Sequence, residues 1–324
     1  MQNWPVWLAT AFASALVGTW GLRRYALTKG LMDQPGQRRS HTVATPRGGG
    51  MSIVLVVLGA TLVAAWMVPS ERVLLLGFCA GLMLVAGIGW WDDHTPLPAA
   101  LRLAVHMTAS AWLGAILHHA GASLPEAAFT AIASVVLINV WNFMDGINGL
   151  AGSQALLAAI AYALVLPPPT GWVAVALAGA CLGFLPFNFP RAGIFMGDGG
   201  SGALGYMLAA LMACAIHLGV ANLGWAWLPL TVFLVDAGFT LVARMRARQA
   251  WWQPHAQHVY QALARKTGSH SWVTLGYAFY SGFLVCIFLS IGAIKRSVAA
   301  LIVVTGLAFA VATWFFLRRK LRGC

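Results

Sequence analysis

Residues 124–152 read LPEAAFTAIASVVLINVWNFMDGINGLAG, and this stretch decides the fold. It begins with an apolar run close to the ~20 residues that a helix needs to cross a bilayer. Asn139, Asn142 and Asp145 follow at a spacing of three, which places them on one face of a helix. A turn capped by Asn and Asp would explain the glycines beyond them, but not polar groups that run back into an apolar span. The stretch predicts a transmembrane helix that presents an amide and a carboxylate at one membrane face.

The rest of the chain has the same apolar character. Of its 324 residues, 60% are hydrophobic and 9% are charged, and the mean hydropathy is +0.77, which is more apolar than a soluble domain can bury. We expect an all-α polytopic membrane protein in which residues 1–324 form a single integral membrane domain. About eleven transmembrane helices are predicted, at residues 4–22, 51–69, 73–90, 101–119, 124–142, 151–167, 171–187, 201–219, 223–243, 273–292 and 297–317.

The distribution of positive charge predicts the orientation. The net charge of +12 does not indicate nucleic acid binding here, because cytoplasmic loops of membrane proteins accumulate Lys and Arg. With the N-terminus outside, seventeen of the twenty basic residues fall on the inner side, and an odd number of spans makes the C-terminus cytoplasmic. We therefore expect a multi-pass protein of the bacterial inner membrane. Its active-site loops would face the cytoplasm, at about residues 23–50, 91–101, 142–152, 187–201 and 244–272.

Acidic residues gather in the same loops. Asp92 and Asp93 follow an apolar helix, where two adjacent carboxylates are costly unless a cation stabilises them. Mg²⁺ prefers one or two carboxylates together with phosphate oxygens, although a solvated pair at a helix end is the simpler alternative. Asp198 stands among glycines at a helix start, where a metal-bound phosphate would meet N–H groups and the helix dipole.

Other loop residues are candidate contacts for an anion. The N–H groups of Gly48–Gly50 precede a helix and could approach an anion, while a flexible basic loop on anionic lipid is the alternative. Arg102 could reach a phosphate. His255 and His258 lack a nearby third ligand for zinc, so hydrogen bonds to phosphate or sugar suit them better. Phe195 is available for stacking, with a role as an interfacial anchor as the alternative.

Five sequence blocks occur in a recognisable order. They are D-x-P…H…P-x-G-G from Asp33, the Asp92–Asp93 pair, N-x-x-N-x-x-D-G-I-x-G-L-A from Asn139, N-x-P…F-M-G-D-x-G-S from Asn188, and a histidine motif at 255–258. By these blocks the chain resembles the polyprenyl-phosphate N-acetylhexosamine-1-phosphate transferases, whose relatives include phospho-MurNAc-pentapeptide transferase. The resemblance covers nearly the whole chain.

The resemblance implies roles for individual residues. Asp198 would be a principal Mg²⁺ ligand, with Asp92 and Asp93 at the metal and lipid-phosphate site and Mn²⁺ as a substitute ion. Asp92, Asp93 and Asp145 would be the catalytic carboxylates. Phe195 would stack on uracil, and the histidines would hold the diphosphate-sugar. The substrate-binding residues would be Asp33, His41, Arg47, Arg102, Asn142, Asn188, Phe195, His255 and His258.

Two departures from the family pattern narrow the prediction. Asn148 occupies a position where many relatives have a second Asp, so a role that needs ionisation there is not expected. His255-Ala-Gln-His258 replaces the H-x-H-H of several relatives and resembles the O-antigen-initiating branch.

The predicted reaction is phosphoryl transfer. The oxygen of undecaprenyl or another polyprenyl phosphate would attack the sugar-linked phosphorus of a UDP-N-acetylhexosamine, and UMP would leave. Asp92 or Asp93 would hold metal and phosphate, with action as a general base as the alternative. The rival functions are a peptidoglycan-precursor transferase, a transporter of lipid-linked sugars, and a structural protein that binds anionic lipid. The expected partners are the two substrates and the lipid bilayer, and a homodimer is compatible with them.

Overall fold

The structure is a computed structural model that describes residues 3–34, 36, 43–249, 255–291 and 296–321. Within these ranges it is a bundle of long helices with one small antiparallel sheet, in which Met32 pairs with Pro46 and Asp33 with Thr45. The elements are α1 (Trp4–Lys29), β1 (Met32–Asp33), β2 (Thr45–Pro46), α2 (Met51–Met67), η1 (Pro69–Glu71), α3 (Arg72–His94), α4 (Ala99–His119), α5 (Leu124–Met144), α6 (Leu150–Val165), α7 (Thr170–Asn188), α8 (Asp198–His217), η2 (Leu228–Leu230), α9 (Thr231–Arg246), α10 (Val259–Thr267), α11 (His270–Ile291) and α12 (Arg296–Lys320).

Helices occupy all eleven predicted positions, which confirms the all-α class. Nine helices of the described chain are long and apolar enough to cross a membrane. The other two, α2 and α6, have 17 and 16 residues. At 1.5 Å per residue they rise about 25 Å, less than the ~30 Å of the hydrocarbon core. The sequence did not predict the short amphipathic helix α10, which lies in the expected loop 244–272.

Local sequence fixes several helix boundaries. α5 begins with a capping box, in which the Ser123 hydroxyl accepts the N–H of Glu126 and the Glu126 carboxylate accepts the N–H of Ser123. Pro167–Pro169 separate α6 from α7 because proline cannot continue a helix. The Thr170 hydroxyl closes this turn by donating to the Pro167 carbonyl.

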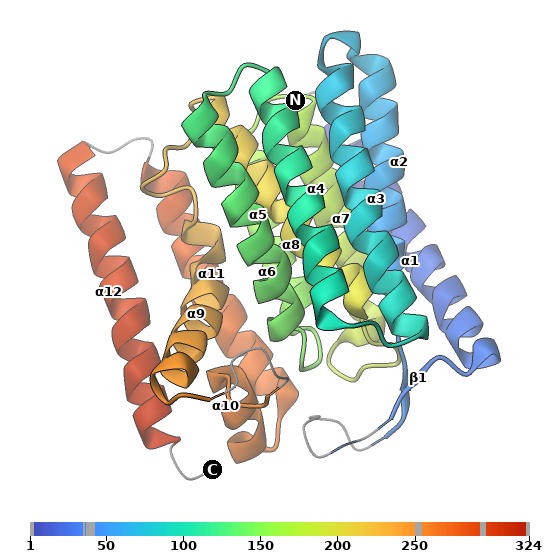
Figure 1. Cartoon of the computed structure of the whole chain (residues 1–324), viewed down its shortest axis with the longest axis vertical. Coiled ribbons are helices and arrows are strands. Elements are labelled where there is room, and N and C mark those ends of the chain that lie inside the picture. Colours follow the sequence, from blue (N-terminus) through green and yellow to red (C-terminus); the bar gives the residue numbers. More distant parts are fainter. Residues whose placement is uncertain (1–2, 35, 37–42, 250–254, 292–295, 322–324) are drawn as a thin grey trace.

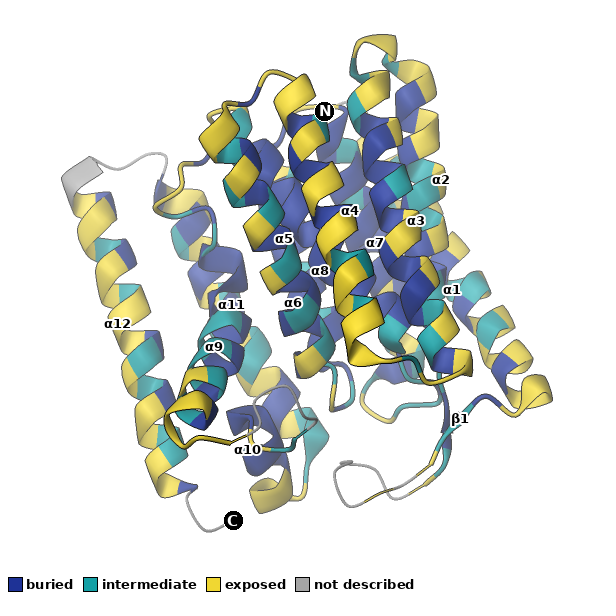
Figure 2. Ribbon diagram, in the orientation of Figure 1, coloured by how far each residue is buried: buried dark blue, intermediate teal, exposed yellow. Residues whose placement is uncertain are grey.

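α8 forms the centre of the bundle. Every residue from Gly199 to Ala215 is buried, and Figure 2 shows the more exposed α4 and α5 in front of this helix. Small residues permit close packing of transmembrane helices. At Gly205 an added Cβ would lie 2.2 Å from the carbonyl oxygen of Leu137 in α5. The packing holds Asp198, the first residue of α8, in a fixed position.

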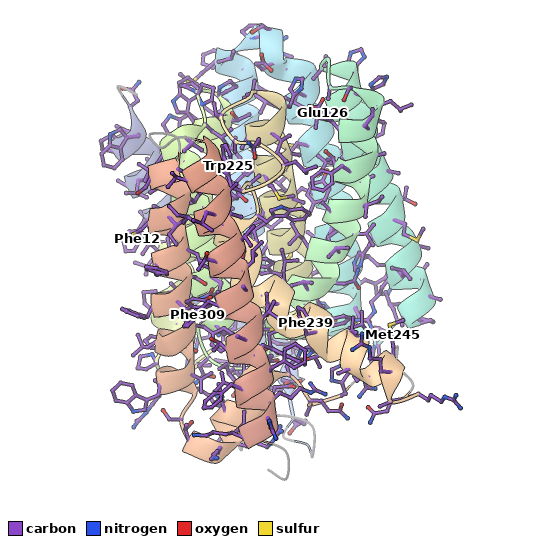
Figure 3. All side chains as sticks on the ribbon, turned by 90° about the vertical axis from the view of Figure 1, so that its left-hand side faces the viewer. Phe12, Glu126, Trp225, Phe239, Met245 and Phe309 are labelled. Carbon is purple, nitrogen blue, oxygen red and sulfur yellow. The ribbon has the colours of Figure 1, made fainter. Side chains whose placement is uncertain are left out.

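The polar connections gather at one end of the bundle. In Figure 1 the N-terminus lies near the top, whereas β1, α10 and the C-terminus lie near the bottom. Figure 3 places Glu126, at the start of α5, and Met245, near the end of α9, at opposite ends. α3 and α5 end, and α8 begins, at the lower end. Asp92, Asp145 and Asp198 therefore lie at the same end of the molecule.

Candidate active site

A carboxylate at the start of α8 is the centre of a polar cluster. Asp198 Oδ2 lies 2.8 Å from Arg102 Nη1, and Asp198 Oδ1 accepts a hydrogen bond of 3.0 Å from Asn142 Nδ2. The same Arg102 nitrogen lies 2.7 Å from Asp92 Oδ2. Asn142 Nδ2 also lies 3.1 Å from the Ser201 hydroxyl, one turn further along α8. Helices α3, α4, α5 and α8 thus bring four of the predicted site residues together.

Asp93 is placed differently from its neighbour Asp92. It is 2% exposed, and its two carboxylate oxygens accept the N–H groups of Asp198 at 3.1 Å and Gly199 at 3.2 Å. A carboxylate at this position caps α8 and opposes the positive end of its dipole. The approach requires glycine at Gly197, where φ is +80° and an added Cβ would lie 2.5 Å from Asp93 Oδ2. Asp93 therefore fixes the start of α8, and with it Asp198.

Arg47 holds the first loop against α3. Its guanidinium donates to the carbonyl oxygen of Asp93, and its Nε lies 4.0 Å from Asp93 Oδ1. Its side chain is 26% exposed, while its Nε is buried.

The donor set at Asp92 and Asp198 fits a divalent cation. Two carboxylates from different helices converge on one cationic nitrogen, and 12% of the Asp92 side chain and 37% of the Asp198 side chain are exposed. In the described parts of the chain no three His, Cys, Asp or Glu side chains form a complete metal cluster. This arrangement suits Mg²⁺, which takes one or two protein carboxylates and completes its shell with water and phosphate oxygens.

Asp145 follows the last residue of α5, next to this cluster. Burial raises the pKa of its carboxyl from 3.8 to about 8, with additional contributions from the negative charges of Asp198 and Asp93. A carboxyl with this pKa holds a proton over much of the neutral range and can exchange it there.

Two groups that were predicted to contact a ligand, the Asn188 amide and the N–H groups of the glycine loop, form hydrogen bonds within the protein. Asn188 is 3% exposed, its Oδ1 accepts the N–H of Gly149, and its Nδ2 donates to the carbonyl of Ile194. The N–H groups of Gly49 and Gly50 donate to the carbonyl oxygens of Phe195 and Met196. Both polar atoms of the Asn188 amide thus join loops of this protein, and of the three glycines at 48–50 the N–H groups of Gly49 and Gly50 are engaged within the protein.

The loop at about residues 23–50 and the loop at about 187–201 are joined by hydrogen bonds between their backbones. Besides the Gly49 contact, the N–H of Phe195 donates to the carbonyl of Pro46. The Phe195 side chain is partly exposed, and its stacking on uracil remains a prediction. Asp33 pairs with Thr45 between β1 and β2. His41 lies outside the described residues.

The histidines lie beside the end of α5. His258, the residue before α10, is 3% exposed, and its ring centroid lies 6.4 Å from that of Phe143 and 4.8 Å from that of His255. Burial and the nearby positive charges lower the pKa of His255 to about 4. The pKa of His258 is also lowered, mainly by burial. Both rings are therefore neutral at neutral pH, and each can donate and accept one hydrogen bond.

Sequence reasoning did not assign two residues of this region. Ser201 lies within hydrogen-bonding distance of Asn142, and its position three residues after Asp198, on the same face of α8, was the signal. Tyr260 is 1% exposed and donates its hydroxyl to the carbonyl of Phe143. No local signal marks Tyr260, because the contact joins segments far apart in sequence.

Comparisons with known proteins show which family the chain belongs to. Residues 75–217 match the model of glycosyl transferase family 4. The chain is 31% identical over 313 residues to the decaprenyl-phosphate N-acetylglucosaminephosphotransferase of Mycobacterium tuberculosis, an alignment that covers 82% of this chain and 77% of that protein. The chain belongs to the polyprenyl-phosphate hexosamine-1-phosphate transferase family.

Other members of the family are similar at comparable levels. The phospho-N-acetylmuramoyl-pentapeptide-transferase of Heliobacterium modesticaldum is 28% identical over 322 residues, which cover 89% of this chain and 96% of that protein. The enzyme of the same name from Acaryochloris marina is 32% identical over 268 residues, which cover 72% and 69%. The matched family region includes Asp92, Arg102, Asn142 and Asp198.

Proposed function

We propose that this protein transfers the sugar-1-phosphate of a UDP-N-acetylhexosamine to a polyprenyl phosphate and releases UMP. The convergence of Asp92 and Asp198 on the guanidinium of Arg102 carries the proposal. Both substrates are phosphates, so a site that combines carboxylates for a metal ion with a guanidinium matches their charge. The similar mycobacterial protein is named for transfer to decaprenyl phosphate.

Asp92 and Asp198 are the residues that would hold Mg²⁺, with Mn²⁺ as a substitute. Bound there, the ion would neutralise diphosphate oxygens and stabilise the negative charge of the leaving UMP. Asn142 orients Asp198 by its hydrogen bond of 3.0 Å, and Asp93 fixes the backbone of Asp198. The protein thus supplies a pre-positioned pair of carboxylates.

Arg102 acts as the phosphate clamp. In the structure its guanidinium bridges the two carboxylates, and with both substrates bound it would contact a phosphate oxygen. A bond forms between an oxygen of the lipid phosphate and the sugar-linked phosphorus, and the bond from that phosphorus to the oxygen of UMP breaks. Positioning and charge neutralisation account for most of the catalysis of such transfers.

The attacking phosphate needs little help with its proton. Its second pKa is near 6, so it is largely dianionic at neutral pH. Asp145, whose pKa is about 8, mostly holds its proton at neutral pH and would donate a hydrogen bond to a phosphate oxygen. His255 and His258, both neutral, would hydrogen-bond the diphosphate-sugar, and Phe195 would stack on uracil. In contrast, Asn188 shapes the site by joining loops instead of contacting sugar.

The site would face the cytoplasm, where UDP-sugars are available. Seventeen of the twenty basic residues fall at this end under the proposed threading, with the N-terminus outside. The reaction would begin a lipid-linked cell-envelope glycan, such as an O-antigen. Against a transporter, the acids of the site gather at one end of the bundle and do not line a path across it.

Purified protein tests this function directly. It is incubated with undecaprenyl phosphate, Mg²⁺ and one UDP-sugar at a time, and UMP is measured. We expect release with a UDP-N-acetylhexosamine and none without the lipid. Release only with UDP-MurNAc-pentapeptide would instead assign the peptidoglycan-precursor reaction, and no release with any sugar would overturn the proposal.

A further inference from the structure

Asp236 is a buried carboxylate inside the transmembrane part of α9. It is 2% exposed, and among the described residues no Lys or Arg side chain forms a salt bridge with it. A buried carboxylate is costly unless hydrogen bonds replace its hydration. An ionisable residue in such a segment is by default a candidate functional residue. The identity of its partners shows what Asp236 does.

Four of the groups that contact its carboxylate come from other helices. Oδ1 accepts the N–H of Val259 at 2.9 Å and Nε1–H of Trp314 at 3.3 Å, and Oδ2 accepts the N–H of Tyr260 at 3.1 Å and the hydroxyl of Tyr277 at 2.8 Å. Within α9, the Thr240 hydroxyl adds a bond of 3.3 Å to Oδ1. Both oxygens are fully engaged, which leaves none for a substrate or a transported proton.

Val259 and Tyr260 are the first two residues of α10, so Asp236 caps this helix from a distance. A negative charge stabilises a helix at this end, where N–H groups lack partners within the helix. α10 has only nine residues, and isolated helices of that length are not stable in water. Asp236 therefore contributes to the position of α10, together with the bond from the His258 N–H to Gln261 and the buried face of the helix.

The capped end of α10 carries the histidine motif. His258 immediately precedes the helix, and its Nδ1 lies 3.9 Å from Asp236 Oδ1. Tyr260, whose N–H is held by Asp236, donates its hydroxyl to the carbonyl of Phe143, the residue after Asn142. The carboxylate is thus linked to the histidines on one side and to the end of α5 on the other.

We infer that Asp236 is a positioning residue that fixes the His255–His258 segment against the end of α5, where that segment binds the UDP-sugar. The inference rests on the proposed function for the nature of the ligand. Asp236 itself touches no substrate. Loss of the Asp236 carboxylate would displace His258 and so weaken binding of the UDP-sugar, whereas binding of the lipid substrate would change little.

Asp236→Asn tests the inference with little change in side-chain size. The amide keeps one acceptor oxygen but replaces the other by an NH₂ group, so one of the N–H groups of Val259 and Tyr260 would face a donor, and the negative charge of the cap would be lost. We expect the KM for the UDP-sugar to rise tenfold or more, while the KM for polyprenyl phosphate stays within twofold. Equal rises in both constants, or no rise in either, would overturn the inference.

A double-mutant cycle separates positioning from general destabilisation. If Asp236 acts through His258, His258→Ala should raise the KM for the UDP-sugar about tenfold in the wild type and less than twofold in Asp236→Asn. Effects that multiply would mean that the two residues act independently. Binding of the UDP-sugar to the wild-type protein, measured by calorimetry, is the reference. If the wild-type protein does not bind the UDP-sugar, the proposed function itself is wrong.

A milder pair of variants covers the case in which Asp236→Asn does not fold. Tyr277→Phe removes one hydrogen bond to Asp236, whereas Tyr280→Phe, one turn further along α11, removes a bond of 3.4 Å to the carbonyl of Gly306. We expect a threefold or greater rise in the KM for the UDP-sugar only for Tyr277→Phe. Equal values for the two variants would overturn the inference.

Discussion

Asp92 and Asp93 are adjacent in sequence, and we predict opposite consequences for their substitution. Asp93→Ala removes the acceptors of two buried N–H groups, those of Asp198 and Gly199. The loss of a helix cap costs about 0.5–2 kcal/mol, and hydrogen bonds to a charged group contribute about 1.5–3 kcal/mol each. We therefore expect a loss of about 2–4 kcal/mol in the free energy of unfolding. At about 2 °C per kcal/mol for a chain of this size, Tm should fall by about 4–8 °C.

Asp92→Asn should instead leave Tm within about 2 °C of the wild type. Its Oδ1 can still accept the N–H of Leu97, a bond of 2.6 Å in the structure. UMP release should fall at least a hundredfold, because a metal ligand is worth several kcal/mol in the transition state. Thermal unfolding in detergent, followed by intrinsic fluorescence, and UMP release are measured for both variants. If Asp93→Ala keeps the wild-type Tm but loses activity, Asp93 is a metal ligand and the capping role is wrong.

Three further predictions concern other parts of the molecule. Phe195→Ala should raise the KM for the UDP-sugar about tenfold and leave that for the lipid unchanged, by analogy with stacking of ~1–3 kcal/mol; an unchanged KM for the UDP-sugar would exclude stacking. In the folded protein the pKa of His255 is lowered to about 4. The stability that the neutral, buried ring contributes is therefore complete above about pH 6.5 and is lost as pH falls towards 4. The Tm of His255→Asn should therefore fall less between pH 7 and pH 5 than the Tm of the wild type. Equal falls in Tm for the two proteins would contradict the lowered pKa of His255. Cysteine labelling from outside intact cells should reach position 168 but not position 265, and the reverse would invert the topology.

Much of this fold could be predicted from the sequence, because lipid imposes a simple length rule. Apolar runs of about 20 residues predicted the nine long helices and the shorter α2 and α6, and the proline turn at 167–169 lies where expected. The convergence of Asp198, Asn142 and Asp92 was also predictable, since Asp92 and Asn142 stand near the ends of α3 and α5 and Asp198 at the start of α8, which all lie at the same membrane face. A polar residue at the end of an apolar span must lie at one of the two membrane faces. Only one orientation of the chain places most of the Lys and Arg residues on the cytoplasmic side.

The different placement of Asp92 and Asp93 could not be predicted. Neighbouring side chains on a helix point about 100° apart, and the sequence does not state which of them faces α8. The same limit applies to Gly49 and Gly50, since a glycine pattern suits either an anion or close contact with another loop. α10 was not predicted because it has only nine residues, and its cap Asp236 lies 23 residues before Val259, although Gln261 also caps it locally.

Transfer of a labelled phosphate tests the central claim most directly. The purified protein is given undecaprenyl phosphate, Mg²⁺ and a UDP-N-acetylhexosamine labelled with ³²P at the sugar-linked phosphorus, with Asp198→Asn as the inactive control. The proposed reaction moves that phosphorus to the lipid, so the label should enter the organic phase in step with UMP release, and Asp198→Asn should show neither. Label that stays in water as UDP while sugar reaches the lipid would contradict transfer of a sugar-1-phosphate.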